Sequence, residues 1–438
     1  MAFGLFGAAG LGSAARGATP APTATQEPGW LPSAVIYEVN TSVFSPQGNF
    51  AGILARMDQL QKLGVTTLWL MPIHPVGQVK SFGSLYCVRD YYGINPKYGT
   101  ADDFRRLIKE AHRRKMKVVM DLVADHTAWD NPWITAHPDW YKHDAKGQIV
   151  PPNDAWKDVA GLDFASPGLR RAMLDVMRYW VRDFDIDGYR CDAAEMVPVD
   201  FWETARVEVK KIKPQFLMLA EAARPDLMAQ AFDLDYGWPL LRAMQDVMGK
   251  GAPASRLQET WEAERLRFRP GALHMQISDD HDEERATVTF GAAGARVASA
   301  LLLTLDGVPL LYNGMEVGDT GKWEPIVWDR SGAASTRAFY QQLLALRRSH
   351  PALQQGATAW QKNSDPARIL TYTRRGNGEE FLVAINVSKQ PFTGRVEIDK
   401  ATRWTDITPG IASNSAPVAL PNLSLDAQAF RIFRRSLP

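Results

Sequence analysis

Short apolar runs alternate with stretches of helical periodicity along most of the chain. The run "AVIYEV" is typical of a buried strand, and after it Ile53, Met57 and Leu60 share one helical face that ends at Gly64. Seven further runs predict strands, each preceded by a plausible helix. They are "VTTLWLMP", "KVVMDLV", "IDGYRCD", "PQFLMLAE", "AFDLDY", "ALHMQIS" and "VPLLYN".

The predicted fold class is α/β. Strands that are apolar throughout are typical of parallel sheets covered by helices on both faces. Eight strand–helix units in a chain of 438 residues predict a (β/α)8 TIM barrel. An open, doubly wound sheet is the alternative, but no Gly-rich phosphate loop follows the first strand, which argues against nucleotide binding.

Two parts of the chain depart from this alternation. After the third strand comes a long connection rich in Trp, Pro and Asp, and so long a loop without structure is uncommon, so 127–162 is predicted to be a short inserted domain B. Near the C-terminus, alternating runs flank a Gly-Asn-Gly turn at 376–378 and predict an all-β domain, a β-sandwich, over 352–438. The barrel then comprises 31–126 and 163–351.

Residues 1–30 form an N-terminal tail of different composition. An apolar, Gly-rich part is followed by a Pro/Thr/Ala linker. The tail resembles a secretory signal but lacks its basic start, so a signal and a disordered tail both remain open. A secreted or periplasmic location is favoured over a cytoplasmic one. Elsewhere no apolar run is long enough to span a bilayer, so no membrane partner is expected.

Composition narrows the functional classes. Hydrophobic residues make up 45% of the chain, charged residues 23%, and the formal net charge is +1, which is ordinary for a globular protein and gives no reason to expect a nucleic-acid partner. The two cysteines, Cys87 and Cys191, have no CxxC spacing, so neither a zinc site nor a disulfide scaffold is expected, while one bridge stays open. The oligomeric state, monomer or dimer, is not indicated.

Polar residues gather at the predicted strand ends, where TIM barrels carry their chemistry. A single acid at a strand end usually caps a helix or is solvated. Several carboxylates together with two histidines and an arginine at one barrel mouth instead indicate a functional site. These residues are Asp121, Asp125, His126, Arg190, Asp192, Glu221, His281 and Asp282.

Paired carboxylates without a metal motif or a nucleophilic Ser or Cys favour glycoside chemistry. Arg190 and Asp192 are two residues apart on a strand and face the same way, so Arg190 is predicted to lower the pKa of Asp192 and keep it ionised. Glu221 follows an apolar strand and has no basic neighbour in sequence. Desolvation is therefore expected to favour its protonated form, as a general acid requires.

These stretches resemble a known family. "DLVADH", "GYRCDAAEM", "LMLAE" and "SDDHDEER" are similar, in this order, to the four short motifs of the α-amylase family, glycoside hydrolase family 13. "LGVTTLWLMPI", "DYYGINPKYGT", "GLDFASP" and "GVPLLYNGMEVG" resemble stretches that flank them. The resemblance extends from about Ala34 to the C-terminus. It implies retaining cleavage of α-1,4-glucosidic bonds in starch or maltooligosaccharides through a covalent glycosyl–Asp intermediate.

The resemblance also implies individual roles. Asp192 is expected to be the nucleophile, Glu221 the general acid/base and Asp282 the transition-state stabiliser. The expected substrate-binding residues are Tyr86, which stacks under the sugar, His126 and His281, which hydrogen-bond it, Arg190, which orients the nucleophile, and Asp121, which supports the site.

Three positions depart from the family pattern. Cys87 stands where many members have an Asp, and Glu195–Met196 replace a Lys-His pair, which argues against a preference for long-chain starch. Asp125 replaces an Asn that helps to bind calcium in many members, and the insert is short. No required cofactor or metal is therefore expected, and structural Ca²⁺ is the only ion that remains open.

Alternative functions were weighed against hydrolysis. A transglycosylase or isomerase on α-glucans, of the glucanotransferase or trehalose-forming type, shares the covalent intermediate. The difference is whether water or a sugar hydroxyl displaces the enzyme's carboxylate from it. A non-catalytic sugar-binding relative is disfavoured because all three expected catalytic carboxylates are present. Among the Trp residues of the insert (Trp129, Trp133, Trp140 and Trp156), at least half are expected to form its own core.

Overall fold

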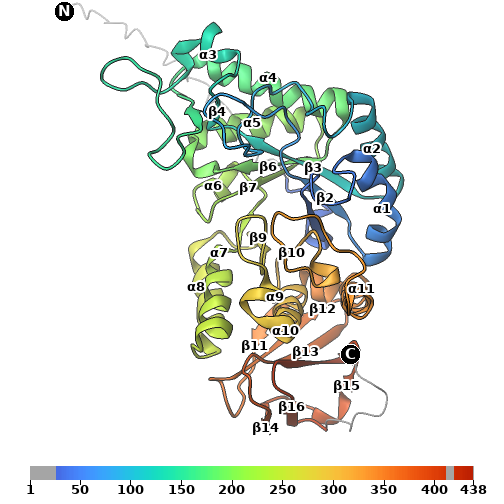
Figure 1. The fold of residues 1–438 in the computed structure, drawn as a ribbon. Helices are drawn as coiled ribbons and strands as arrows, with labels where there is room; N and C mark the ends of the chain where they lie inside the picture. The colour runs from blue at the N-terminus through green and yellow to red at the C-terminus, as the bar shows by residue number, and fades with distance from the viewer. Residues whose placement is uncertain (1–25, 411–418, 438) are drawn as a thin grey trace, which may run out of the picture.

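The computed structural model describes residues 26–410 and 419–437, so most of the predicted tail lies outside the described residues. Figure 1 shows a barrel surrounded by helices, with the insert toward the top of the view and a β-rich region at the bottom. Within the described ranges, every helix is too short or too polar to cross a bilayer.

Eight parallel strands close into a barrel, which confirms the predicted fold class. Around the barrel they follow the order β1-β10-β9-β8-β7-β6-β3-β2. The eight predicted runs supply them all: β1 Ile36–Val39, β2 Thr67–Leu70, β3 Lys117–Val123, β6 Gly188–Asp192, β7 Leu217–Ala220, β8 Leu234–Tyr236, β9 Leu273–Gln276 and β10 Val308–Tyr312. Closure pairs the first strand with the last, so that Glu38 lies between Trp69 and Tyr312 in register.

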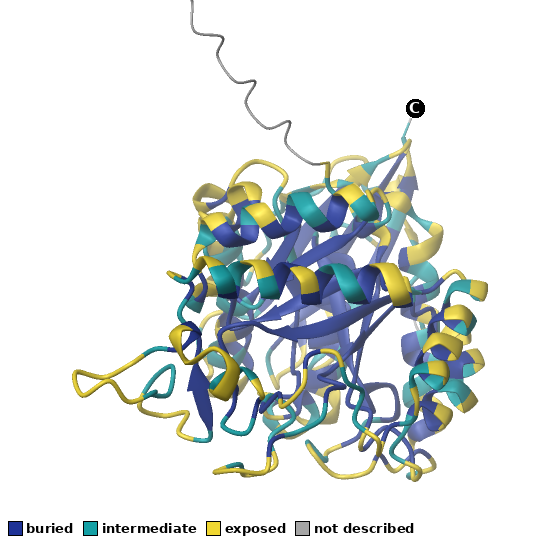
Figure 2. Cartoon of the chain, turned by 90° about the horizontal axis from the view of Figure 1, so that it is seen from above, coloured by how far each residue is buried: buried dark blue, intermediate teal, exposed yellow. Residues whose placement is uncertain are grey.

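Helices cover the outside of the barrel, and Figure 2 shows their buried faces turned toward the dark-blue strands. Their bounds are α1 Phe50–Leu63, α2 Ala101–Arg113, α4 Pro167–Phe184, α5 Val199–Ile212, α6 Leu227–Gln230, α7 Trp238–Met244, α8 Ser255–Arg267, α9 Ala286–Thr289, α10 Gly291–Thr304, α11 Ala333–Ser349 and α12 Pro351–Gln355. Local sequence defines their ends: Thr100 and Asp103 form a reciprocal capping box at α2. Gly64 ends α1 in the left-handed conformation, with φ of 110°.

The long connection after β3 contains two short antiparallel strands, β4 His126–Ala128 and β5 Val159–Gly161, and the helix α3 Trp133–Ala136. The rings of Trp133 and Trp140 pack 5.2 Å apart, and Trp140 is buried. Trp129 lies under Lys80, whose Nζ is 3.6 Å from the ring centroid. Trp156, at 36% exposure, is the residue of this group that reaches the cleft described below, so the expectation that at least half serve the insert's own packing is confirmed.

The C-terminal region consists of a five-stranded antiparallel sheet, in the order β11-β12-β13-β17-β15, and a two-stranded sheet, β14-β16. Their bounds are β11 Ala357–Trp360, β12 Ile369–Gly376, β13 Glu379–Asn386, β14 Phe392–Arg395, β15 Thr405–Asp406, β16 Asn422–Leu425 and β17 Ala429–Ser436. Asn377 and Gly378 have φ of 50° and 74° and form the predicted hairpin turn. Arg374 Nη1 donates to the Thr304 carbonyl at 2.7 Å and so joins this region to α10.

Candidate active site

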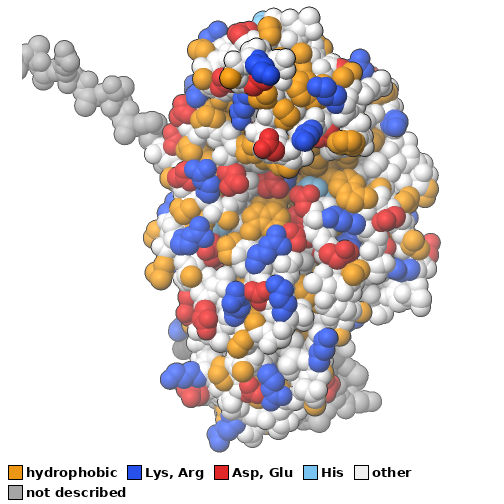
Figure 3. All heavy atoms as spheres, turned by 60° about the vertical axis from the view of Figure 1, so that its left-hand side comes forward, with side chains coloured by type: hydrophobic (Ala, Val, Ile, Leu, Met, Phe, Trp, Pro, Cys, Tyr) orange, Lys and Arg blue, Asp and Glu red, His pale blue; other side chains and the backbone are white. Residues whose placement is uncertain are grey.

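A cavity of about 230 Å³ lies at the C-terminal ends of the barrel strands. Figure 3 shows acidic and histidine side chains in a hollow with hydrophobic side chains on both sides. The cavity is lined by Ser84, Tyr86, His126, Trp156, Asp158, Val159, Asp192, Ala193, Glu221, His281 and Asp282. Six of the predicted site residues are therefore brought together in one cavity. The other two, Asp121 and Arg190, are buried and contact members of this group.

Arg190 is the buried hub of the site. Its Nη1 lies 2.9 Å from Asp121 on β3 and 2.7 Å from Asp192 on its own strand. Its Nη2 lies 2.9 Å from Oε1 of Glu221, which follows β7. The sequence predicted the contact with Asp192, whereas the contact with Glu221 depends on β6 and β7 being neighbours in the barrel.

Arg190 acts to lower the pKa of Asp192, as predicted, but the predicted net result, a lowered pKa, is wrong. Burial raises the pKa of Asp192 above its ordinary value, and the nearby carboxylates of Glu221 and Asp121 raise it further. These effects outweigh the lowering by Arg190. Burial is the main reason, and the one guanidinium charge that opposes it is shared by three carboxylates. In this cleft the ionised form of Asp192 is therefore less favoured than its spacing from Arg190 in the sequence indicated.

His281 contacts three side chains around the cavity. Its Nδ1 lies 2.6 Å from Oε1 of the fully buried Glu38, and its Nε2 lies 3.1 Å from Asp282. The Tyr86 hydroxyl lies 2.8 Å from the same Nε2 and donates to Asp121 at 3.2 Å. Burial opposes the charge on His281, but Glu38, Asp282 and Asp280 raise its pKa well above the ordinary value.

Asp282 projects into the cleft, with 54% of its side chain exposed. Burial acts to raise its pKa, but the hydrogen bond and charge of His281, together with Arg190 and Lys322, bring the pKa below the ordinary value. Lys322 also donates to the Asp282 carbonyl. The lowered pKa favours the ionised form of Asp282.

His126 lies on the insert side of the cavity. Its Nε2 is 3.1 Å from the Tyr86 carbonyl, and its Nδ1 is 2.9 Å from the buried Asp125. Burial acts to lower the pKa of His126, but the Asp125 charge raises it above the ordinary value. The Trp156 ring stands edge-on to His126, with centroids 5.7 Å apart.

Sequence reasoning missed three residues of the site. Glu38 lies within the first predicted strand, where a lone carboxylate in an apolar run was the available signal. Lys322 and Trp323 follow β10, and the Trp323 ring stands edge-on to His281 at 6.2 Å. No local pattern marks these two, because only the course of the chain after β10 brings them to the cleft.

Both cysteines are free and buried, so the open question of one bridge is answered. Burial raises the pKa of the Cys191 thiol well above its ordinary value. Cys191 is therefore a packed thiol on the strand that ends at the nucleophile candidate.

Two groups of acidic residues and histidines among the described residues come close enough to share a metal ion: Asp125, His126 and Asp192, and Asp280, His281 and Asp282. Calcium takes six to eight oxygen ligands. Each group contains an imidazole, and His126 and His281 already contact carboxylates through their ring nitrogens. Neither group fits a calcium site.

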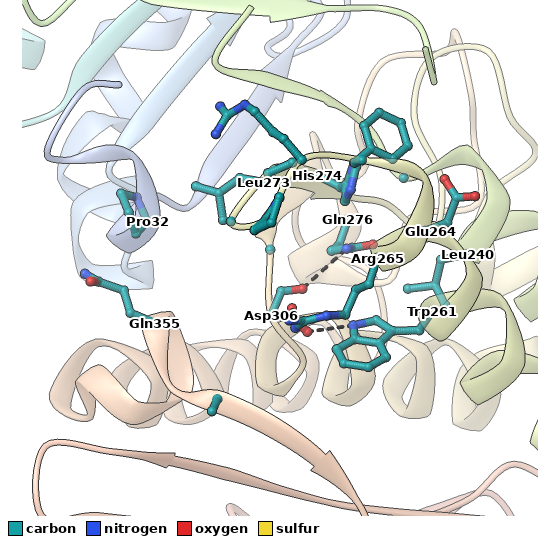
Figure 4. A pocket seen from close by; sticks show the side chains of 18 of the residues that line it. Pro32, Leu240, Trp261, Glu264, Arg265, Leu273, His274, Gln276, Asp306 and Gln355 are labelled. Atoms are coloured by element: carbon teal, nitrogen blue, oxygen red, sulfur yellow. Dashed lines mark hydrogen bonds and ion pairs between the residues drawn. The ribbon is translucent and has the colours of Figure 1, made fainter. Parts of the chain in front are cut away.

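A second cavity, of about 400 Å³, lies near the beginnings of β9 and β10, at the other end of the barrel from the cleft (Figure 4). Figure 4 shows Trp261 and Gln276 directed toward Asp306. Trp261 Nε1 donates to Oδ1 of Asp306 at 2.7 Å, and Gln276 donates to the Asp306 carbonyl at 3.3 Å. Since the N-terminal face of a TIM barrel serves mainly stability, we assign this cavity a structural role.

Comparison with known proteins agrees with the geometry. The family model of the alpha amylase catalytic domain matches residues 23–368. An alpha-amylase of Haloarcula japonica is 30% identical over 403 residues, which cover 87% of this chain and 59% of the relative. A cyclomaltodextrinase of Geobacillus thermopakistaniensis is 29% identical and is matched over 83% of this chain and 66% of its own length. The chain thus spans about three fifths to two thirds of these relatives.

Solved structures give the same assignment. An alpha-amylase from Lactobacillus plantarum superposes with a TM-score of 0.82 at 29% identity, covering 92% of this chain and 99% of the other. The maltogenic alpha-amylase AmyB of Thermotoga neapolitana gives 0.81 at 26% identity, covering 93% and 100%. The chain belongs to the α-amylase family, glycoside hydrolase family 13.

Proposed function

We propose that this protein is a retaining glycoside hydrolase that cleaves α-1,4-glucosidic bonds in starch or maltooligosaccharides. One observation carries the proposal: the carboxylates of Asp192 and Glu221 contact the two terminal nitrogens of one guanidinium group at the wall of the cavity. This contact keeps the carboxylates close together, as retaining enzymes require, whereas inverting enzymes leave room for a water between theirs.

The proposed reaction has two displacements. An oxygen of Asp192 attacks the anomeric carbon while Glu221 gives its proton to the glycosidic oxygen, so the bond to the leaving sugar breaks as the glycosyl–Asp bond forms. Glu221, now a carboxylate, then takes a proton from water. The resulting hydroxide attacks the same carbon and releases Asp192.

The surrounding residues have supporting roles in this proposal. Asp282, His281 and His126 would bind the sugar hydroxyls, and Tyr86 would support the ring from its position against His281. A cavity of about 230 Å³ is below the size typical of ligand pockets, which suits one sugar unit. Further units would extend to the exposed rings of Trp156 and Trp323 beside it.

We also propose that no calcium ion is required, since neither group of acids and histidines offers an oxygen cage. A secreted or periplasmic location is proposed over a cytoplasmic one on the composition of the tail. Fractionation of cells that express the full chain, with activity assayed in each fraction, tests the location. Activity after exhaustive dialysis against a chelator tests the metal requirement.

Product analysis with maltotriose tests the central proposal. The expected products are glucose and maltose alone, with retention at the new anomeric centre in an NMR time course. Products longer than maltotriose would identify a transglycosylase instead, and an inverted first product would refute the retaining mechanism. Glu221→Gln is expected to lose about 10²- to 10⁴-fold in kcat, the usual contribution of general acid catalysis.

A further inference from the structure

Glu38 is a buried carboxylate that the two proposed displacements do not use. It lies on β1 with no exposed surface, and barrel closure places it beside Tyr312 of β10 and Trp69 of β2. Its Oε1 contacts His281, which lies 243 residues further along the chain. An isolated carboxylate in such a position is costly unless a cation or donors compensate for it.

The two ring nitrogens of His281 both face carboxylates. Nδ1 lies 2.6 Å from Glu38, and Nε2 lies 3.1 Å from Asp282. The Tyr86 hydroxyl is also 2.8 Å from Nε2 and 3.2 Å from Asp121, so it can accept from Nε2–H while it donates to Asp121. Because an ionised carboxylate only accepts hydrogen bonds, a ring with one protonated nitrogen would leave one of these contacts unfilled. The doubly protonated imidazolium fills all of these contacts.

We propose that Glu38 is a positioning residue that keeps His281 doubly protonated and aims its Nε2–H at the sugar-binding cavity. The Glu38 carboxylate holds the ring through Nδ1, on the side away from the cavity, so the Nε2–H faces Tyr86, Asp282 and a bound sugar. The effect on the rate rests on the proposed function, whereas the effect on the state of His281 does not. This arrangement is a carboxylate–histidine pair with the opposite nitrogen directed into the site.

The charged and titratable groups that face His281 come from several elements. They are Glu38 on β1, Tyr86 before α2, Asp121 on β3, and Asp280 and Asp282 in the segment after β9. Asp280 is buried, and burial raises its pKa to about 7, with His281 acting to lower it. Glu38 is the group in direct contact with Nδ1, so its removal should lower the affinity of the ring for its second proton most directly.

Two substitutions separate charge from orientation. In Glu38→Gln the amide oxygen can still accept from Nδ1–H, but the negative charge is lost. In Glu38→Leu both the charge and the acceptor are lost. Glu316→Gln is the matched control. Glu316 is another fully buried carboxylate with one hydrogen-bonded oxygen, which accepts from the Tyr37 hydroxyl at 2.8 Å. Glu316 does not line the cavity.

Two measurements test the proposal on the full chain. Heteronuclear NMR of the imidazole nitrogens, with the His281 signal assigned from a His281→Asn variant, reports the protonation of His281 against pH. The pH profile of kcat/KM on maltotriose reports its effect on the rate. We expect Glu38→Gln to move the titration of His281 and the alkaline limb of the profile downward by at least about one pH unit. Near neutral pH, kcat/KM should fall roughly 10- to 100-fold.

Glu38→Leu should lose more activity than Glu38→Gln. Glu316→Gln should leave both the His281 titration and the alkaline limb of the kcat/KM profile as they are in the wild type. An unchanged His281 titration in Glu38→Gln overturns the inference, as does an equal downward shift in Glu316→Gln. If the wild type releases no sugar from maltotriose, the proposed function fails, while the NMR titration still decides the role of Glu38.

Discussion

Nη2 of Arg190 lies 2.9 Å from Oε1 of Glu221, although Arg190 lies on β6 and Glu221 follows β7. The same guanidinium contacts Asp192 and Asp121, and it has no exposed surface. A planar guanidinium can hold several carboxylates at defined angles, which a lysine ammonium does not do. The spacing of the acid and the nucleophile candidates therefore depends on this one side chain.

Arg190→Lys is expected to lower kcat on maltotriose by about 100-fold or more, because the bridge between the two carboxylates is lost. It should also lower the free energy of unfolding by about 3–5 kcal/mol, since buried carboxylates lose their partner. Urea unfolding and steady-state kinetics measure both. Arg242→Lys is the control: Arg242 makes a two-pronged pair with Glu283 at the surface and should cost under about 1 kcal/mol. Similar effects of both variants would contradict the assigned role.

Tyr86→Phe should retain the ring but remove the hydroxyl that contacts His281 and Asp121. We expect kcat/KM on maltotriose to fall about tenfold, the value of one hydrogen bond between partly buried groups. Tyr189→Phe removes a buried hydroxyl that donates to the Met177 carbonyl at 3.0 Å, away from the cavity. It should cost about 1 kcal/mol of stability with kcat unchanged. A wild-type rate for Tyr86→Phe would argue against this hydroxyl having a part in the reaction.

Trp323→Ala should affect long substrates more than short ones. The Trp323 ring is 44% exposed beside His281, where a second or third sugar unit would stack. We expect KM for maltotetraose to rise about fivefold, while KM for an aryl α-glucoside changes little. Leu266→Ala, at an apolar position on α8 that is 88% exposed, is the control. Equal changes for both substrates would show that Trp323 does not provide an extended binding surface.

Acid stability should depend on Asp187. Burial acts to raise its pKa, but hydrogen bonds and charges from His112 and Lys213 bring it down to about 2. Because the unfolded carboxyl binds protons more readily than the native one, this contribution is complete above about pH 4 and is lost as the pH falls toward about 2. Its size is roughly 2–3 kcal/mol.

Asp187→Asn should therefore be less stable than the wild type at neutral pH, and the difference should shrink as the pH falls from about 4 to about 2. Urea unfolding across this range measures it. Asp102→Asn removes a carboxylate that is 92% exposed and pairs with Arg105, and this control should leave the profile unchanged. A difference between wild type and Asp187→Asn that stays constant with pH would mean that Asp187 acts through packing rather than charge.

The fold was predictable because its signals are local. The capping box of Thr100 and Asp103, the Asn377–Gly378 turn and the apolar runs of all eight strands are each contained within a few residues. The long insert was recognisable from its length, and two of its Trp residues, Trp133 and Trp140, pack on each other as expected. The limits proposed for the domains and the roles proposed for the site residues stay predictions.

The sequence by itself determined which carboxylates meet. Asp192 and Glu221 end neighbouring parallel strands and Asp282 follows a further one, and parallel strands bring their carboxyl ends to one face of a barrel. Only the tertiary structure decided how those charges interact. The sharing of Arg190 with Glu221 and the pairing of Glu38 with His281 depend on which strands adjoin and on the closure of β1 against β10. Electrostatic effects depend on distance and burial, and these are properties of the closed barrel rather than of residue spacing.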